Sequence, residues 1–223
     1  MKPPLFIAGP TAVGKSAIAL ALAEKIGGEI ISVDSMQVYR GLDIGTAKPT
    51  ADERKRIPHH LIDVCDLTDN FDVAQFIRLA QKAVEEIQAR NHLPIFCGGT
   101  GLYFNAYLSG LGEAPSANPE LRVELEAMPF EKLLSELRER DSETYEKIDK
   151  QNPRRVIRAI EVIRLTGKKF SEQKAEWKTE DGKQKSEKIF VLMRKPEDLH
   201  ARINFRVDEM FRRGLVDETR ELL

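Results

Sequence analysis

Cysteine, net charge and long apolar runs are all scarce in this sequence. The two cysteines, Cys65 and Cys97, are too few and too far apart for a disulfide framework or a zinc site, and they are typical of a reduced cytoplasmic protein. Because no run of about 18 apolar residues occurs, we predict no transmembrane helix. The formal net charge of −1 shows no overall preference for nucleic acid, so any such binding would need a local basic surface.

What is present instead is the composition of a folded globular chain. Apolar residues make up 41% and charged residues 32% of the 223 residues, which suits one domain with an elaboration or two small domains. Residues 1–4 lead directly into a predicted strand and have no signal-peptide pattern. Residues 214–223 predict a helix with no Gly or Pro stop signal after Leu223. We therefore expect the chain to be part of a longer protein.

The most specific motif lies near the start of the chain. A short apolar run precedes it and an alanine-rich helical stretch follows it, which is the strand–loop–helix context of a phosphate-binding loop (P-loop). Backbone N–H groups and the helix start would hold an anion, with Lys15 at the outer phosphate and the Ser16 hydroxyl on Mg²⁺. The motif therefore predicts binding of a di- or triphosphate. It is a full match to G-x-x-x-x-G-K-[ST], formed by Gly9, Pro10, Thr11, Ala12, Val13, Gly14, Lys15 and Ser16.

The rest of the chain alternates predicted strands and helices. A long amphipathic helix is predicted over 72–90, with Asp72 as its N-cap. This alternation predicts an α/β fold, a P-loop NTPase-like parallel sheet flanked by helices. The predicted strands are buried runs at 5–8, 29–33, 93–97 and 188–193, with a short candidate at 59–64.

The composition of the sequence changes at Pro115. Residues 116–150 are dense in Glu, Arg and Leu and carry no strand signal, which predicts a small all-helical insertion. We therefore expect three segments. They are a first part of the α/β core at 1–114, a helical insertion at 115–150, and a return to the core at 151–223.

Two predicted strands end in polar residues. Asp34 and Ser35 follow the strand at 29–33, and a Gly-rich turn carrying Thr100 follows the strand at 93–97. In an open parallel sheet, ligands bind at this carboxyl edge. Small-molecule kinases place an Asp after the second strand to accept a proton, so Asp34 is interpreted as a general base that faces the P-loop. A loop-capping role for Asp34 is the alternative.

Three arginines share one side of a predicted helix that begins at Asn152. On its helical wheel, Arg154, Arg155 and Arg158 lie within about 100° of one another. A solvated surface is the ordinary interpretation of such a pattern. The absence of an interleaved acid in the first two turns favours binding of a phosphate backbone or a pyrophosphate.

Two further patterns leave their roles open. Arg202 and Arg206, four residues apart on the last predicted helix, either close over bound phosphates or pair with Asp198 or Glu209. The adjacent histidines at 59–60 have no further Cys or His nearby at ligand spacing. We therefore expect a hydrogen-bonded structural role for them and no metal site.

Five stretches together closely resemble the tRNA dimethylallyltransferases, also called tRNA isopentenyltransferases. They are the P-loop, the block from Asp34 to Pro49, and the segments 58–63, 98–103 and 153–162. The block from Asp34 to Pro49 is highly specific, whereas a P-loop alone occurs in many families. The resemblance spans nearly the whole chain in order and spacing, and members of the family usually continue past the point where this chain ends.

The resemblance implies transfer of a dimethylallyl group from dimethylallyl diphosphate to the N6 amine of the adenosine just 3′ of the anticodon in tRNA, with release of pyrophosphate. It implies catalytic roles for Asp34, Thr100 and Lys15, with Thr100 on the bridging oxygen of the diphosphate. The P-loop residues 9–16 and Arg206 would bind the diphosphate, and Ser16 would hold Mg²⁺. The residues implied to contact tRNA are Asp34, Ser35, Met36, Gln37, Thr100, Arg122, Arg154, Arg155, Val156, Ile157 and Arg158.

The resemblance also implies how RNA would be held. The helical insertion would grip the anticodon stem-loop, and the target adenosine would leave its stack to reach the site. We expect a cytoplasmic monomer without membrane contact. Three alternatives stay open: an adenylate isopentenyltransferase that uses free AMP, ADP or ATP, a P-loop small-molecule kinase, and a catalytically silent RNA-binding module.

Overall fold

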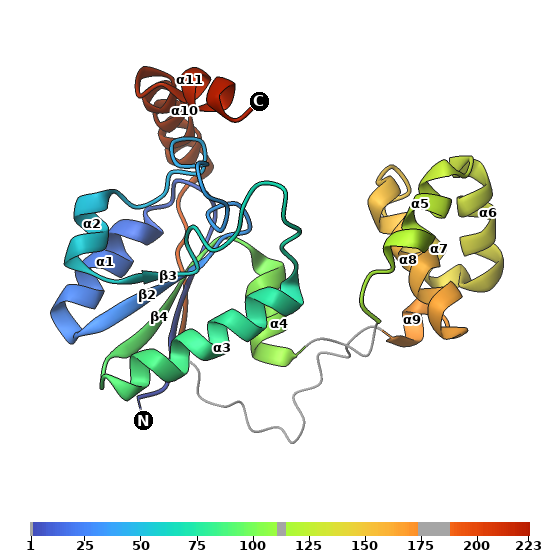
Figure 1. Ribbon diagram of the computed structural model, residues 1–223, viewed down its shortest axis with the longest axis horizontal. Coiled ribbons are helices and arrows are strands. Elements are labelled where there is room, and N and C mark those ends of the chain that lie inside the picture. The colour runs from blue at the N-terminus through green and yellow to red at the C-terminus, as the bar shows by residue number, and fades with distance from the viewer. Residues whose placement is uncertain (1, 111–114, 174–187) are drawn as a thin grey trace. The chain divides into compact units, whose positions relative to one another are not determined.

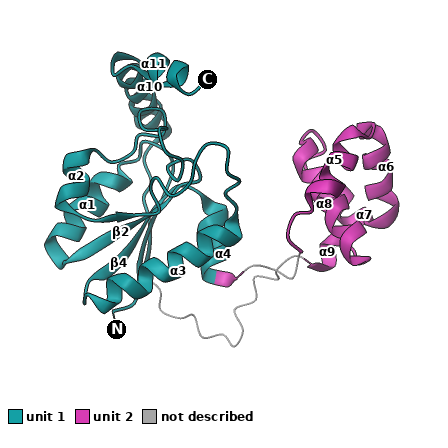
Figure 2. Cartoon of the chain, in the orientation of Figure 1, with its two compact units in different colours: residues 1–108, 181–223 teal, residues 109–180 magenta. Residues whose placement is uncertain are grey.

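The computed structural model describes residues 2–110, 115–173 and 188–223. These residues form two compact units, shown in different colours in Figure 2. The first unit holds residues 2–108 and 188–223, and the second holds residues 109–110 and 115–173. In the described part of the chain, no helix is both long enough and apolar enough to cross a membrane.

The first unit is built on a parallel sheet. Its described strands lie in the order β3-β2-β4-β1-β5, and each pairs with its neighbour in parallel. All six residues of β2 are buried, as expected where helices cover both faces of a parallel sheet. The strands are β1 (Leu5–Ala8), β2 (Gly28–Val33), β3 (His59–His60), β4 (Leu93–Gly98) and β5 (Lys188–Val191).

Helices cover both faces of this sheet, and α10 and α11 lie beyond its carboxyl edge (Figure 1). Side chains alternate between the two faces of a strand. Phe6 therefore packs in a cluster with Phe76 of α3, whereas Leu5 and Ile7 pack in another cluster with Ala19 of α1. This arrangement confirms the predicted α/β fold. The helices of this unit are α1 (Lys15–Ile26), α2 (Ala51–Arg56), α3 (Val73–Ala89), α4 (Gly101–Ser109), α10 (Pro196–Arg212) and α11 (Leu215–Glu221).

Two strands are shorter than the sequence predicted. β3 contains only residues 59–60, because Leu61 and Asp63 have positive φ values of 61° and 56° that turn the chain out of the extended conformation. β5 ends at Val191 rather than at Met193. Both differences lie at strand ends, where the apolar pattern alone sets no boundary.

The second unit contains only helices among its described residues. The apolar side of α8 packs on α5 and α6, so this helix belongs to the second unit and not to the α/β core. The helical insertion is therefore wider than the predicted 115–150, and the return to the core comes later than residue 151. The helices are α5 (Pro119–Ala127), α6 (Phe130–Arg140), α7 (Ser142–Lys147), α8 (Pro153–Thr166) and α9 (Phe170–Gln173).

Glu29, at the start of β2, is a buried carboxylate that binds groups from three other segments. Arg90 donates to its two oxygens at 2.9 and 2.8 Å, and nitrogens of His60 and His92 lie 2.6 and 2.8 Å from them. Burial alone would raise the pKa of the Glu29 carboxyl, but the hydrogen bonds from Arg90 and the histidines outweigh it and hold the pKa at about 2. The ring of His59 lies 2.7 Å from a backbone carbonyl oxygen. Both adjacent histidines are therefore hydrogen-bonded, as predicted.

Replacing Glu29 by Gln is expected to lower the free energy of unfolding of the first unit by about 2–4 kcal/mol at pH 7, because Arg90 and the two histidines lose their anionic partner. The pKa of Glu29 in the folded state is depressed, so its contribution is present above about pH 4.5 and is lost as the pH falls toward 2. Native-state hydrogen exchange of α3 and β4 measures the loss. The control Glu24→Gln removes a surface contact with Arg56 and should cost less than about 1 kcal/mol. Equal losses in both variants would contradict the central role of Glu29.

Candidate active site

The P-loop joins the end of β1 to the start of α1. Gly14 has a φ of 106° and Ala12 a φ of 62°, both in the left-handed region that lets the backbone curl. The first N–H groups of a helix have no partner inside it and carry partial positive charge. The loop therefore has a backbone suited to an anion, as its sequence motif predicts.

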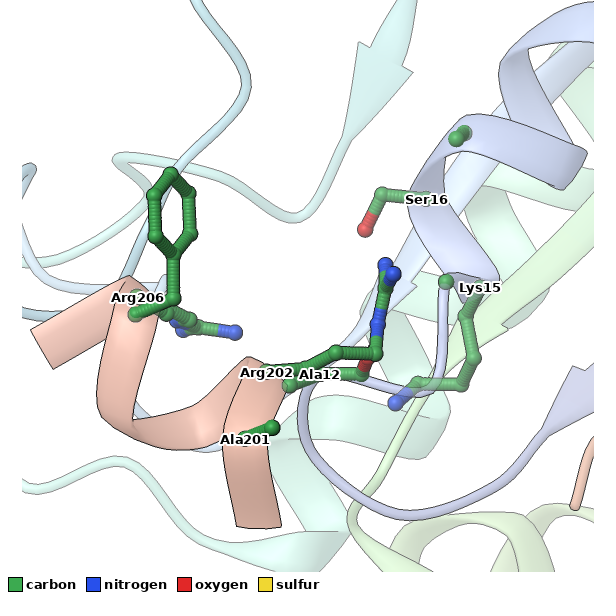
Figure 3. A pocket seen from close by; sticks show the side chains of 9 residues that line it. Ala12, Lys15, Ser16, Ala201, Arg202 and Arg206 are labelled. Carbon is green, nitrogen blue, oxygen red and sulfur yellow. The ribbon is translucent and has the colours of Figure 1, made fainter. Parts of the chain in front are cut away.

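A cavity of about 520 Å³ opens beside this loop. Figure 3 shows Arg202 and Arg206 extending from α10 into the space beside Lys15 and Ser16 at the start of α1. The cavity thus combines three cationic side chains with one hydroxyl group. Its composition fits an anion that carries several negative charges.

The carboxylates that were alternative partners for the α10 arginines bind elsewhere. Asp198 binds Arg194 at 2.7 Å, and Glu209 binds Arg212. Arg206 instead lines the cavity. This arrangement favours the phosphate-closing role for Arg206 over a surface ion pair.

Two cations of the cavity are partly removed from water. Burial lowers the pKa of Lys15, whose ammonium group donates to the Pro10 carbonyl oxygen at 2.8 Å. Burial also lowers the pKa of Arg206, while the Asp34 carboxylate acts on both groups in the opposite direction. Since the charged forms have lost hydration and lie near one another, an anion between them would stabilise both.

Arginines also bind the backbone of the P-loop. Arg194 Nε donates to the carbonyl oxygen of Val13 and Arg202 Nε to that of Ala12, each at 2.8 Å. Two carbonyl oxygens of the loop therefore accept charge-assisted hydrogen bonds from arginines. Arg194 is not predicted as a site residue from the sequence. The only feature that could have indicated it is its position directly after the last predicted strand.

Further polar side chains of the site follow the ends of β2 and β4. Asp34 Oδ1 accepts the backbone N–H groups of Met36 at 2.8 Å and Gln37 at 3.3 Å. Thr100 Oγ1 accepts the N–H of Ser35 at 3.3 Å. Both contacts to Asp34 end on one oxygen, so Oδ2 is the oxygen suited to accept a proton. Asp34 thus has the loop-capping role, and this role leaves its second oxygen available for the predicted one.

Glycines at the end of β4 and in the turn after it let the chain approach both neighbouring segments. A Cβ atom at Gly98 would lie 2.0 Å from the Val33 carbonyl oxygen, so only glycine fits there. A Cβ atom at Gly99 would lie 3.8 Å from Lys15 Nζ. The turn that carries Thr100 is therefore adjacent to both β2 and the P-loop lysine.

The loop after Asp34 is held by two side chains that point inward. Gln37 accepts the Ser32 hydroxyl at 2.8 Å and donates to the carbonyl oxygens of residues 46 and 47 at 3.1 and 3.2 Å. The buried ammonium group of Lys48 donates to Asp43 at 2.7 Å and to Asp63. Lys48 is not predicted as a functional residue, because a lysine in a polar loop is usually exposed. Gln37 and Lys48 therefore shape the loop.

The basic residues predicted to contact RNA divide into two groups within the second unit. Arg122 Nε and Arg158 Nη1 bind the fully buried carboxylate of Glu161 at 3.1 and 2.6 Å. Arg154 and Arg155 are exposed.

One member of the predicted RNA-binding set needs correction. The side chain of Val156 is fully buried in the core of the second unit, because it lies on the apolar side of α8. Ile157 is partly buried and packs against the same core. A contact between the Val156 side chain and RNA is therefore excluded by its burial.

Comparison with known proteins agrees with this geometry. A family model described as "IPP transferase" matches residues 37–223, which is most of the chain. The chain belongs to the IPP transferase family. It is 46% identical to tRNA dimethylallyltransferase 1 of Trichlorobacter lovleyi, with all of this chain and 74% of that protein covered. It is also 46% identical to tRNA dimethylallyltransferase of Levilactobacillus brevis, with 97% and 71% covered.

Two solved structures are similar to this chain in both fold and sequence. The tRNA isopentenylpyrophosphate transferase from Bacillus halodurans is 40% identical with a TM-score of 0.63, and the match covers all of this chain and 70% of that one. A eukaryotic dimethylallyltransferase acting on tRNA is 32% identical with a TM-score of 0.75, with all of this chain and 56% of that one covered. The family resemblance drawn from the sequence is confirmed.

Replacing Lys15 by Met is expected to weaken pyrophosphate binding by about 10- to 100-fold at pH 7, because a charged hydrogen-bond donor is lost. Burial lowers the pKa of Lys15, so the wild-type affinity should begin to fall with rising pH below 10.5, the ordinary lysine value. Titration calorimetry across this range measures both effects. Lys15→Arg keeps its charge and controls for the ionisation of pyrophosphate itself. An identical pH profile in Lys15→Arg would contradict the assignment to Lys15.

Proposed function

We propose that this chain transfers the dimethylallyl group of dimethylallyl diphosphate to the N6 amine of the adenosine 3′-adjacent to the anticodon in tRNA, releasing pyrophosphate. The observation that carries this proposal is the turn after β4, which joins the P-loop cavity to the Asp34 segment: Thr100 accepts the N–H of Ser35 at 3.3 Å, and a Cβ atom at Gly99 would lie 3.8 Å from Lys15 Nζ. One site thus combines a place for a diphosphate with a candidate base. The relatives named tRNA dimethylallyltransferase support the same reaction.

The leaving pyrophosphate needs positive charge as the carbon–oxygen bond breaks. Lys15, Arg206 and the N–H groups of the P-loop would supply this charge from fixed positions. The Ser16 hydroxyl lines the same cavity, and one protein oxygen together with phosphate oxygens and water is a ligand set that Mg²⁺ accepts. Ser16 would therefore hold Mg²⁺, which when bound adds positive charge beside the leaving group.

The acceptor amine is a weak nucleophile, because its lone pair is delocalised into the adenine ring. In the proposed step, N6 forms a bond to C1 of the dimethylallyl group while the bond from C1 to the bridging oxygen breaks. N6 gives its proton to Asp34, and the electron pair of the broken bond leaves with pyrophosphate. Thr100 Oγ1 accepts the N–H of Ser35, so its own hydrogen can be donated to the bridging oxygen.

Contacts with tRNA are proposed at exposed side chains. Met36, beside Asp34, is 47% exposed, and Arg154 and Arg155 of the second unit are exposed. The target base would leave its stack to reach Asp34. We propose that the protein acts as a monomer in the cytoplasm, where the two buried free cysteines would stay reduced.

Replacing Asp34 by Asn is expected to lower kcat for prenyl transfer by about 100- to 10,000-fold, because the proton acceptor is lost. Asn keeps an oxygen for the N–H groups of Met36 and Gln37, so affinities for pyrophosphate and tRNA should change little. The measurement is single-turnover transfer of label from dimethylallyl diphosphate to unmodified tRNA.

Free AMP, offered in parallel, separates the proposal from its alternatives. Label on tRNA that collapses in Asp34→Asn supports both the reaction and the base. Label on AMP alone would assign an adenylate isopentenyltransferase. If ATP is consumed with a metabolite and no label reaches either acceptor, the proposal is overturned in favour of a kinase.

The double variant Arg154→Gln, Arg155→Gln is expected to weaken tRNA binding and to reduce the slope of log K against log salt by about 1–2, because two phosphate contacts are lost. The contrasting variant is Arg122→Gln, which removes a partner of the buried Glu161 and should mainly destabilise the second unit. Filter binding over a salt series and thermal denaturation measure the two effects. An unchanged salt slope in the double variant would remove these arginines from the RNA interface.

A further inference from the structure

Glu218 of α11 makes contacts that the proposed chemistry does not use. Its Oε2 accepts the backbone N–H of Asp43 at 2.9 Å and of Ile44 at 2.6 Å, and its Oε1 accepts that of Gly45 at 2.9 Å. Three successive N–H groups of a loop form a concavity that binds an anion. Here the anion is a side chain that lies 173 to 175 residues further along the chain.

The loop that Glu218 binds is joined to the acceptor residues. Its carbonyl oxygens at Thr46 and Ala47 accept the side-chain amide of Gln37 at 3.1 and 3.2 Å. The backbone N–H of Gln37 donates to Asp34 Oδ1 at 3.3 Å. Gln37 therefore connects the loop to the proposed base, because its side chain binds the loop and its backbone N–H binds Asp34.

Two leucines, Leu215 in α11 and Leu222 directly after it, lie close to glycines of the same loop. A Cβ atom at Gly45 would lie 3.1 Å from the side chain of Leu215, and one at Gly41 would lie 3.1 Å from that of Leu222. The two glycines thus allow α11 to lie directly against the loop. Contacts on both sides of Glu218 hold its carboxylate over the three N–H groups.

α11 is also attached to the helix that closes the phosphate cavity. It follows α10 after a turn at Gly214, whose φ is 97°, and the N–H of Glu218 donates to the Gly214 carbonyl oxygen at 2.9 Å. α10 carries Arg206, which lines the cavity, and Arg202, which donates to the P-loop. An anion that fixes Arg206 therefore also fixes the helix that precedes α11.

We propose that Glu218 is a positioning residue that couples diphosphate binding at α10 to the shape of the acceptor loop, residues 41–48. The identity of the two ligands rests on the proposed function. Diphosphate in the cavity would restrain α10, and Glu218 would pass this restraint to residues 43–45 and so to Gln37 and Asp34. By linkage, bound tRNA raises the affinity for the diphosphate by the same factor.

The charge of Glu218 is the testable element. Ionised oxygens accept N–H groups more strongly than neutral ones, and both oxygens of Glu218 are used. Glu218→Gln keeps the size of the side chain but replaces one acceptor oxygen with a donor that faces an N–H group. Glu221→Gln is the matched control, because it removes the same charge from an exposed position of α11.

The first experiment measures the affinity of unmodified anticodon stem-loop RNA with and without magnesium pyrophosphate. In the wild type and in Glu221→Gln, pyrophosphate is expected to tighten RNA binding about tenfold. In Glu218→Gln this gain should fall below about twofold, while the affinity of the RNA-free protein for pyrophosphate stays unchanged. The proposal is overturned if pyrophosphate still tightens RNA binding tenfold in Glu218→Gln, or if it does not tighten RNA binding in the wild type. It is also overturned if the RNA-free Glu218→Gln protein loses affinity for pyrophosphate by the same factor as it loses the gain in RNA affinity.

Hydrogen exchange of residues 41–48 tests the link without RNA. Magnesium pyrophosphate alone should slow exchange at residues 43–45 about tenfold in the wild type and not in Glu218→Gln. If this pattern is found while no RNA is bound or prenylated, the proposed function fails and the link from α10 to the loop stands. If prenyl transfer occurs while pyrophosphate protects the loop equally in both proteins, the link fails and the proposed function stands.

Discussion

The register of three parallel strands is the constraint on which the first unit depends. Gly98 of β4 pairs with Ala8 of β1 on one side and with Val33 of β2 on the other. The P-loop, the Asp34 segment and the Thr100 turn leave the sheet directly after these three residues, so a single register brings them to one edge. A slip by one residue would turn every side chain of a strand to the opposite face and separate the carboxylate from the phosphate site.

The second constraint is that the P-loop and the cavity beside it are held by residues from a distant part of the chain. Arg194 and Arg202 engage carbonyl groups of the P-loop, while Lys15 and Arg206 face the cavity with reduced hydration. Fixed charges of this kind need little rearrangement as a leaving group becomes negative. The elements that provide them come from the two ends of the chain, so neither end forms the phosphate site alone.

Local patterns in the sequence predict the local parts of this structure. The P-loop is a run of consecutive residues, and Asp34 and Thr100 each follow a short apolar run that predicts a buried strand. The distant partners of carboxylates are not predictable in this way. Glu29 and Glu161, which are buried, and Glu218, which is partly buried, each bind groups between 31 and 175 residues away, although Glu161 also binds Arg158 three residues away. In the sequence each stands where a glutamate is usually exposed. The apolar side of α8 is also a local pattern and is predicted from the sequence. An apolar side does not indicate which unit the helix packs against, so sequence alone assigns α8 to the wrong unit.

The place of the helical unit in the chain also sets an order for synthesis. β1 pairs with β5, and Arg194 reaches Val13 across 181 residues of sequence. A ribosome therefore completes β1 to β4 and the whole second unit before the last strand and α10 exist. The second unit, whose described contacts join segments close in the chain, can fold as soon as it emerges, whereas β1 cannot complete its pairing until β5 has been made. The nascent chain thus contains the complete P-loop sequence long before the phosphate site can form. A chain that ends before α10 lacks the cations that this helix contributes.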